Sequence, residues 1–244
     1  MKPVASNQVL VELKASVRDY LVRLYPEHDV DALTEDIIQL MGFDQDLAAV
    51  ESHVNLWDET DIVTITYGDS IKKDDEYPLQ TLHNFLCNYL SETVNAVHIL
   101  PFYPFSSDDG FSVINYSEVN QSLGDWENIK DIAKDFKLMA DLVINHCSSR
   151  SLWFDNFKQR KHPGLDYFIE CDPETDLGDV VRPRTSPLLR KTDTLDGEKH
   201  VWCTFSHDQV DLDFQNPQVL MEFVKIIKLY LDHGVQLFRL DAVA

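Results

Sequence analysis

Two charged side chains near the end of the chain, Arg239 and Asp241, have the types and the spacing that first suggest chemistry. They lie in the stretch GVQLFRLDAVA, whose apolar residues between positions 235 and 240 predict a strand that is buried on both faces. Residues two apart in a strand share a face, so the guanidinium and the carboxylate can pair. The pair is either a structural ion pair at a strand end or the means of keeping a reactive carboxylate ionised.

Alternating strand and helix patterns precede this pair. Strands are predicted in residues 61–69, 138–146 and 235–241, and residues 95–105 predict a strand that leads into a loop rich in proline and aromatic residues. Helices are predicted in residues 77–90, 124–136 and 216–234. Asp125 and Asn216 are the expected N-caps of the last two helices. Such alternation predicts parallel strands joined by right-handed crossovers, in a doubly wound sheet or a (β/α) barrel.

The two remaining segments have a different character. Residues 1–57 predict a helical extension, because apolar residues recur three and four positions apart before Pro26, at Leu10, Leu13, Val17, Tyr20 and Leu24. Residues 147–213 contain Pro, Gly, Asp and Thr without a long amphipathic period, and they are too long for an ordinary loop. We therefore expect an inserted subdomain there, between residues 58–146 and residues 214–244.

Composition narrows the possible partners. Lys and Arg total 21 against 42 Asp and Glu, and the net charge of -21 disfavours nucleic acids and anionic membranes. The four cysteines lack CxxC spacing, which predicts reduced thiols in a cytoplasmic protein and argues against zinc. The sequence contains neither a signal-peptide pattern nor an apolar run long enough for a membrane span. We expect neither a metal nor a cofactor.

Polar side chains are predicted at the carboxyl end of each strand. Because these ends meet at one edge of a parallel sheet, the sequence predicts a site there, formed by Tyr67, Asp108, Phe111, Asp141, Asn145, His146, Arg239 and Asp241. Taken singly, SSDDG could be a turn, His146 a buried structural histidine and Asp141 the anchor of a loop. Four successive strands that deliver hydrogen-bonding groups to the same edge favour a functional site.

Carboxylates beside aromatic rings suit sugar chemistry. Asp108 can accept from sugar hydroxyls, His146 can donate to them, and the rings of Phe111 or Tyr67 can cover the apolar face of a pyranose. Cleavage of a glycosidic bond with retention needs one carboxylate as nucleophile and a second about 5 to 5.5 Å away as acid and base. Asp241, held ionised by Arg239, fits the first role.

Several motifs resemble those of glycoside hydrolase family thirteen, the α-amylase family. DLVINH resembles its first signature region, GVQLFRLDAVA its second, and QVDLDFQNP the short signature of its B domain. AVHILPFYPFSSDDGF, RPRTSPLL and VWCTFSHDQVDLDF are similar to stretches of the sucrose phosphorylase branch. The resemblance runs from about Asp61 to Ala244 and implies the first half of a (β/α)8 barrel, with a B-domain insertion after the third strand.

The same resemblance implies roles for individual residues. It makes Asp241 the nucleophile and Arg239 the residue that orients it, with Asp141 and Asn145 as structural residues of the rim. It implies that a glucosyl unit binds to Asp108, Phe111 and His146, with Phe205 and Gln209 at the entrance. Arg182 and Arg184 are placed near phosphate or the acceptor, which agrees with the need for cationic donors in an acidic chain, although RPR alone is typical of a solvated loop.

The family's later regions, which carry its general-acid glutamate, do not occur in these 244 residues. We therefore expect this chain alone to be inactive, and its open half barrel to self-associate. The extension and RPRTSPLL favour relatives that act on glucosylglycerate or similar glucosides. The substrates would be a sugar and inorganic phosphate. A hydrolase or transglucosylase of the same family, and a non-catalytic sugar-binding protein, remain alternatives.

Overall fold

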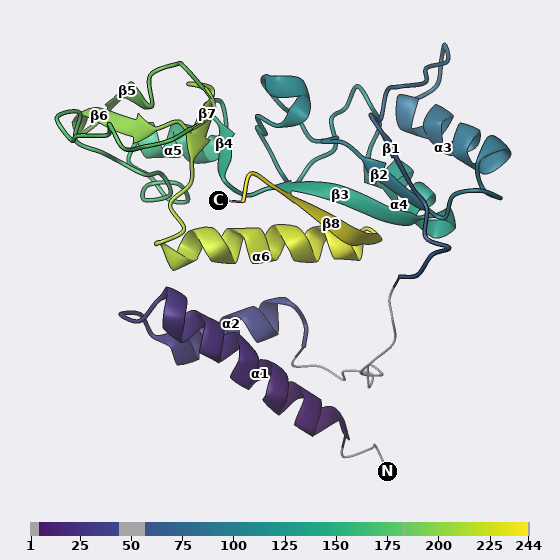
Figure 1. Ribbon diagram of the computed structural model, residues 1–244, viewed down its shortest axis with the longest axis horizontal. Helices are drawn as coiled ribbons and strands as arrows, with labels where there is room; N and C mark the ends of the chain where they lie inside the picture. Colours follow the sequence, from purple (N-terminus) through teal and green to yellow (C-terminus); the bar gives the residue numbers. More distant parts are fainter. Residues whose placement is uncertain (1–4, 44–56, 183, 244) are drawn as a thin grey trace. The chain divides into compact units, whose positions relative to one another are not determined.

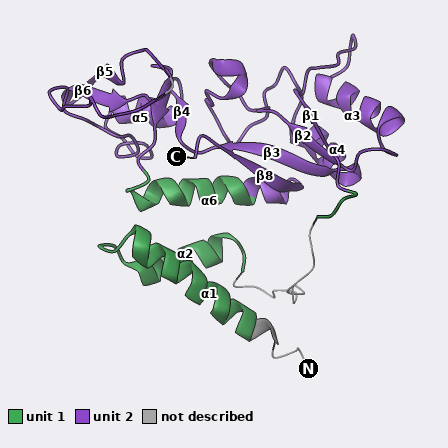
Figure 2. Cartoon of the chain, viewed as in Figure 1, with its two compact units in different colours: residues 1–60, 214–228 green, residues 61–213, 229–244 purple. Residues whose placement is uncertain are grey.

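The computed structural model describes residues 5–43, 57–182 and 184–243 of the chain. The chain divides into two compact units, which Figure 2 shows in different colours. Unit 1 comprises residues 1–60 and 214–228, and unit 2 comprises residues 61–213 and 229–244. Residues 44–56 of the predicted helical extension lie outside the described residues.

Unit 1 is helical, as the spacing of apolar residues predicts. Helix α1 spans Ala5–Leu24, and helix α2 spans Val30–Leu40. α2 begins after Asp29, whose carboxylate accepts a hydrogen bond from the Ala32 amide at 3.0 Å and so satisfies one of the free N–H groups of the first turn. The core of this unit consists of Leu21, Tyr25 and Val30, with Val17, Leu33, Ile37 and Leu220 packed against them.

The buried face of α1 differs from the predicted one. Tyr20 and Leu24, which the spacing placed on the apolar face, are 62% and 63% exposed. Leu21 and Tyr25, one position further along, are buried instead, and the Tyr25 hydroxyl donates to the Phe214 carbonyl at 2.9 Å. Val17 belongs to the predicted apolar face and also to the face that is buried. The helical period alone therefore does not decide which of the two faces packs inward.

Unit 2 contains a sheet of four parallel strands in the order β1-β2-β3-β8, which Figure 1 shows as neighbouring arrows. The strands are Val63–Thr66 (β1), Ala96–Ile99 (β2), Lys137–Val143 (β3) and Val235–Asp241 (β8). Their spatial order follows their order in the chain. This is the arrangement of successive strands in a (β/α) barrel.

Helices connect these strands, and local sequence signals explain where each helix begins. Helix α3 spans Pro78–Tyr89 and has its proline at the first turn, while helix α4 spans Trp126–Asp135. Asp125 caps α4, as predicted, and it also forms a capping box with Asn128. The apolar residues that these helices bury are Leu79, Leu82 and Leu86 of α3 and Ile129 and Ile132 of α4.

Strand β8 is not buried on both faces, so that prediction is wrong. Val235 is 1% exposed, but Leu240 is 55% exposed, and β8 has β3 as its one neighbour in the described sheet. β1 at the opposite edge resembles it, with Ile65 65% exposed. An edge strand has a neighbour on one side alone, so its apolar side chains retain more solvent contact than those of β2, which are all buried.

The segment between β3 and the last helix contains short elements that the sequence analysis did not predict. Helix α5 spans Leu152–Lys158. Two antiparallel pairs accompany it: β4 (His146–Ser148) with β7 (Gln209–Asp211), and β5 (Leu189–Thr194) with β6 (Gly197–Trp202). The β4–β7 pair joins residues that are about sixty positions apart in the sequence, next to the edge where β3 ends.

Helix α6 spans Pro217–Asp232 and leads into β8. The Asn216 side chain accepts from the Gln218 amide at 2.9 Å, which confirms its predicted role as N-cap. Among the described helices, none combines the length and the apolar character needed to cross a membrane.

We predict that Gly110→Ala destabilises the loop that follows β2. Gly110 has a φ of 108°, and a Cβ atom there would lie 2.8 Å from the Cβ of Pro101 and 2.9 Å from its carbonyl oxygen. Both the left-handed conformation and this clash oppose alanine, so the free energy of unfolding should fall by about 2 to 4 kcal/mol in urea titrations.

Gly197→Ala is the matched control, because Gly197 has a φ of 105° but no atom within 4 Å of the added Cβ. Its cost should be that of the backbone conformation alone, about 1 kcal/mol. Equal costs at both positions would show that Pro101 does not crowd Gly110.

Candidate active site

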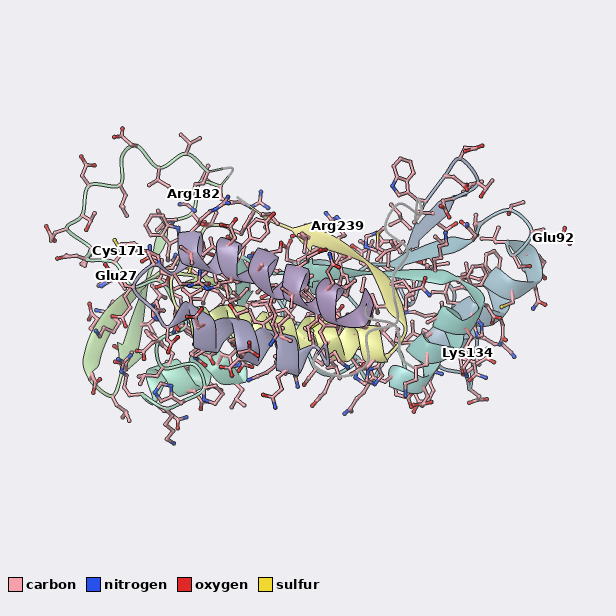
Figure 3. The ribbon with its side chains drawn as sticks, turned by 90° about the horizontal axis from the view of Figure 1, so that it is seen from below. Glu27, Glu92, Lys134, Cys171, Arg182 and Arg239 are labelled. Atoms are coloured by element: carbon pink, nitrogen blue, oxygen red, sulfur yellow. The ribbon has the colours of Figure 1, made fainter. Side chains whose placement is uncertain are left out.

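The described structure brings most of the predicted site residues to one edge of the sheet in unit 2. The register of β3 and β8 sets Asp141 opposite Arg239 and Val143 opposite Asp241. Backbone pairing therefore fixes the positions of Arg239 and Asp241 along the edge of the sheet. Figure 3 labels Arg239 on β8. Tyr67 follows β1, and the loop after β2 carries Asp108 and Phe111.

A network of ion pairs and hydrogen bonds joins three neighbouring strands at this edge. The Arg239 guanidinium donates through Nη1 to Asp141 Oδ1 and lies with Nη2 2.9 Å from Asp241 Oδ1. Asp141 is 0% exposed, and its other oxygen lies 2.8 Å from His98 Nε2 of β2. The predicted Arg239–Asp241 pair is therefore present, and Asp141 and His98 extend it into the core.

The pKa of Asp241 is not lowered, although Arg239 lies beside its carboxylate. Burial raises the pKa of Asp241, Arg239 lowers it, and the nearby Asp141 and Asp108 carboxylates raise it further, so the pKa lies above its ordinary value. Arg239 offsets part of the cost of burial without reversing it. The charge of Asp108 is therefore close enough to Asp241 to affect its carboxyl group.

His146 is buried at the start of β4 and is held in one orientation. Its Nε2 lies 3.0 Å from the Phe111 carbonyl oxygen, and because a carbonyl can only accept, the tautomer that makes this bond carries its proton on Nε2. The Asn145 amide nitrogen lies 3.5 Å from Nδ1. Burial is the main reason that the pKa of His146 is lowered to about 4, so the ring is neutral near pH 7.

Gln209 of β7 connects His146 to the loop after β2. Its amide nitrogen lies 3.0 Å from His146 Nε2 and donates to Asp108 Oδ2 at 2.9 Å, while its carbonyl oxygen accepts from the Ser206 hydroxyl at 2.9 Å. The bonds to Asp108 and Ser206 fix the orientation of the amide. The contact with His146 Nε2 is not a hydrogen bond in the tautomer that donates to Phe111, because both nitrogens then carry protons. Asp108 is exposed and retains its second oxygen for a ligand.

Aromatic rings lie over these polar groups. The Phe205 ring is 5.1 Å from the His146 ring, and the Arg239 guanidinium lies over the Phe111 ring at 5.5 Å. Tyr67 is 37% exposed, and its pKa is raised by burial and by the charges of Asp109, Asp141 and Asp108. The predicted combination of carboxylates and rings is thus assembled.

A cavity of about 390 Å³ lies beside this network rather than over it. Tyr67 is the one residue of the predicted site among those that line it, together with Gly68, Asp69, Pro101, Phe105, Asp109, Asn120, Ser122 and Leu123. Asp241, His146 and Asp108 are not among the residues that line this cavity, so the cavity does not mark the candidate active site.

Arg182 and Arg184 lie in the insertion, where Figure 3 labels Arg182. The Arg182 guanidinium donates to the Thr204 carbonyl at 3.2 Å, and the Arg184 guanidinium lies over the Phe205 ring at 5.8 Å. They reach the site through Thr204 and Phe205, and the described contacts include none between either arginine and Asp241.

Asp211 is a buried residue of this region that the sequence analysis did not assign to the site. Its carboxylate accepts from the Thr204 hydroxyl and from the Thr204 amide at 3.2 Å, and it also interacts with the Asn145 side chain. Burial outweighs these contacts and raises the pKa of Asp211 to about 6. Asp211 lies in QVDLDFQNP, the stretch that resembles the B-domain signature, and this resemblance could have identified it as a candidate site residue.

The described residues contain one group that could hold a metal ion, and it lies away from this edge. His83 and Cys87 of α3 and Asp135 at the end of α4 place their ligand atoms within 4.8 Å of one another. The His83 Nε2 is 2.7 Å from Asp135 Oδ2, and burial and Asp135 raise the pKa of the Cys87 thiol. Asp135 comes just before β3 begins, at the opposite end of the sheet from Asp241.

We predict that His146 contributes less to stability as the pH falls. Its pKa is about 4 in the folded protein and about 6.5 in an unfolded chain, so between these values the unfolded chain binds more protons. Lowering the pH through this window should remove on the order of 3 kcal/mol. In urea titrations, the difference in unfolding free energy between parent and His146→Gln should therefore shrink from about pH 7 to about pH 4.5.

Asp211→Asn provides a comparison of opposite sign. The pKa of Asp211 is raised from 3.8 to about 6, so between these pH values the folded protein binds more protons than the unfolded chain. The destabilising effect of this buried carboxyl group therefore decreases as the pH falls. The difference between parent and Asp211→Asn should grow over the same range. A pH-independent difference for His146→Gln would contradict the neutral, buried imidazole.

Comparison with known proteins shows which family the chain belongs to. Residues 87–244 match the family model for the α-amylase catalytic domain. The chain is 51% identical over 77% of its length to a glucosylglycerate phosphorylase of Spirochaeta thermophila, and 46% identical over 95% of its length to one of Allomeiothermus silvanus. It covers 32% and 41% of these two relatives, so it spans about a third to two fifths of their length.

A solved structure gives the same result for the fold. The sucrose 6F-phosphate phosphorylase of Thermoanaerobacter thermosaccharolyticum is 31% identical and superimposes with a TM-score of 0.70, over 77% of this chain and 41% of that one. This likeness confirms the predicted fold class, in which β1, β2, β3 and β8 are the first four strands of a (β/α)8 barrel. The chain therefore belongs to the α-amylase family, glycoside hydrolase family thirteen, and spans an N-terminal region of its catalytic domain.

Proposed function

We propose that the protein is a retaining α-glucosyl phosphorylase that transfers the glucosyl unit of glucosylglycerate, or of a related α-glucoside, to inorganic phosphate. The observation that carries the proposal is the Arg239 guanidinium, which bridges the buried Asp141 and the strand-end Asp241. This bridge supports Asp241 as the nucleophile, since it orients one carboxylate toward the edge where Asp108 and His146 lie.

The first half of the proposed reaction is attack by Asp241. A carboxylate oxygen forms a bond to the anomeric carbon while the bond from that carbon to the leaving oxygen breaks, giving a glucosyl ester. The leaving oxygen takes a proton from a general acid, a role that we assign to none of the described residues. Arg239 is a positioning residue in this step, because it holds the Asp241 carboxylate rather than the sugar.

The second half is attack by phosphate. A phosphate oxygen bonds to the anomeric carbon as the ester bond to Asp241 breaks, which yields α-glucose 1-phosphate and restores the carboxylate. Phosphate is anionic and needs less help from a general base than water does. Arg182 and Arg184, two arginines in a chain of net charge -21, support a phosphate site beside Phe205.

The remaining residues would bind the glucosyl unit. We assign sugar-hydroxyl contacts to Asp108, which keeps one free carboxylate oxygen, and to His146 and Gln209. Phe111, Phe205 and Tyr67 would cover apolar parts of the ring or line the entrance. In this proposal residues 58–146 and 214–244 supply the barrel, residues 147–213 the B domain, and residues 1–57 an extension.

Replacement of Asp241 by asparagine should abolish glucosyl transfer, because an amide cannot form the glucosyl ester. The donor of choice is α-glucosyl fluoride, since fluoride leaves without a proton and the assay then needs no general acid. With phosphate present, formation of α-glucose 1-phosphate should fall by more than about 10³-fold. Asp172→Asn, which changes an exposed carboxylate of the insertion, is the control that should retain activity.

Thermal unfolding should remain within a few degrees of the parent for both variants, so that loss of activity is not loss of fold. Activity of Asp241→Asn within about tenfold of the parent would remove Asp241 from the nucleophile's role.

Replacement of Arg184 by alanine should weaken phosphate use more than hydrolysis. Arg184 is exposed, so its removal leaves no buried charge without a partner. We expect the KM for phosphate to rise about tenfold, while release of free glucose from α-glucosyl fluoride changes by less than about twofold. Arg182→Ala should act in the same direction, and Arg184→Lys should restore part of the affinity. If both reactions decline equally, the arginines do not belong to the phosphate site.

A further inference from the structure

The carboxylate of Asp208, just before β7, accepts hydrogen bonds from four serine hydroxyls. Oδ2 accepts from Ser106 at 2.5 Å, from Ser107 at 2.6 Å and from Ser112 at 3.1 Å, and Oδ1 accepts from Ser149 at 2.7 Å. Three of these serines lie in the loop after β2, and the fourth lies beyond β4. We call Asp208 with these four residues the serine clamp.

No lysine, arginine or histidine among the described residues forms an ion pair with Asp208. Burial alone would raise its pKa, but the four hydroxyls outweigh burial and lower the pKa below its ordinary value. Hydrogen bonds to an ionised acceptor are stronger than those between neutral groups. The clamp is therefore a charged acceptor whose ionisation depends on its contacts with the loop.

The loop that the clamp holds has an unusual backbone. Asp108, Asp109 and Gly110 have φ values of 58°, 49° and 108°, so three successive residues adopt the left-handed region. Aspartate tolerates that region better than most residues, but two non-glycine residues in succession still cost free energy. Such a conformation persists where surrounding contacts fix it, and the clamp holds the loop on both sides of these three residues.

The clamp is linked to the candidate active site through adjacent residues. Gln209, which follows Asp208 in the chain, donates to Asp108 Oδ2, and Asp108 follows Ser107. A backbone contact supports the same link, because the Ser149 amide donates to the Asp208 carbonyl at 2.8 Å. The single proton of the Ser112 hydroxyl is shared between this carbonyl oxygen, at 3.0 Å, and Asp208 Oδ2. Any movement of the loop away from Asp208 therefore moves Asp108 and Phe111 as well.

We propose that Asp208 is a positioning residue that holds the 106–112 loop against β7, so that Asp108 and Phe111 meet His146 in the arrangement that binds a sugar. The part of this proposal that concerns sugar rests on the proposed function. The part that concerns the loop stands on the clamp alone. Asp208 itself touches neither Asp241 nor Arg239 in the described contacts.

Hydrogen–deuterium exchange and calorimetry with glucose test the two parts separately. In Asp208→Ala, exchange of the amides of residues 106–112 should accelerate at least about tenfold, while exchange in β3 stays within about twofold of the parent. Glucose affinity should fall by about tenfold or more. Asp208→Asn keeps one acceptor oxygen without the charge and should give a smaller change in both measurements, and Ser107→Ala, which removes one of four hydroxyls, should do the same.

Asp193→Ala is the matched control, because Asp193 is an exposed carboxylate on β5, and it should alter neither measurement. If Asp208→Ala fails to fold, Asp208→Asn and Ser107→Ala decide by the same criteria. Unchanged exchange in residues 106–112 overturns the proposal, as does faster exchange of that loop with glucose affinity unchanged. If the parent protein does not bind glucose, the proposed function fails, and the exchange pattern still decides whether Asp208 holds the loop.

Discussion

The site depends on one buried carboxylate. Asp141 is 0% exposed in the middle of the sheet, and a carboxylate taken out of water without partners costs several kcal/mol. His98 of β2 and Arg239 of β8 supply those partners, one from each neighbouring strand, and the Tyr103 hydroxyl donates to the Asp141 carbonyl at 3.0 Å. Because Arg239 must reach Asp141, its second nitrogen is left to hold Asp241. The position of Asp241 thus follows from the need to compensate a charge in the core.

The insertion completes the site by folding back onto the end of β3. The short antiparallel pair of β4 and β7 brings Gln209 and Asp211 next to His146 and Asn145. The serine clamp then ties the same strand β7 to the loop that carries Asp108. The loop after β2 and strand β7 are about one hundred residues apart in the sequence. The Asp208 carboxylate and the Gln209 amide hold them together by hydrogen bonds.

Local signals in the sequence predicted the framework well, because each depends on residues that are close in the chain. The N-caps Asp125 and Asn216 and the strand–helix alternation are of this kind. The pairing of Arg239 with Asp241 also follows from strand geometry alone. The site residues within the insertion were found through family motifs rather than through any period in the sequence; they are Arg182, Arg184, Phe205 and Gln209.

What the sequence did not reveal depends on contacts between distant segments. The strands β4 and β7 are three residues each, too short for a periodic pattern, and the partners of Asp208 and Asp211 are set by that pairing. The apolar residues of β8 predicted burial on both faces, but burial depends on which neighbours a strand has. The raised pKa of Asp241 arises from burial together with Asp141 and Asp108, which no spacing near Asp241 indicates.

The central claim is that Asp241 forms a covalent bond to a glucosyl unit, and trapping that bond tests it most directly. The protein is mixed with α-glucosyl fluoride without phosphate, quenched in acid and digested, and its peptides are examined by mass spectrometry. As the bond from Asp241 to the anomeric carbon forms, the carbon–fluorine bond breaks and fluoride leaves with the electron pair. We expect the peptide that contains Asp241 to gain the mass of one anhydroglucose unit, and to lose it again when phosphate is added before the quench. A glucosyl group on another carboxylate, or none on Asp241 while glucose 1-phosphate is still formed, would contradict it.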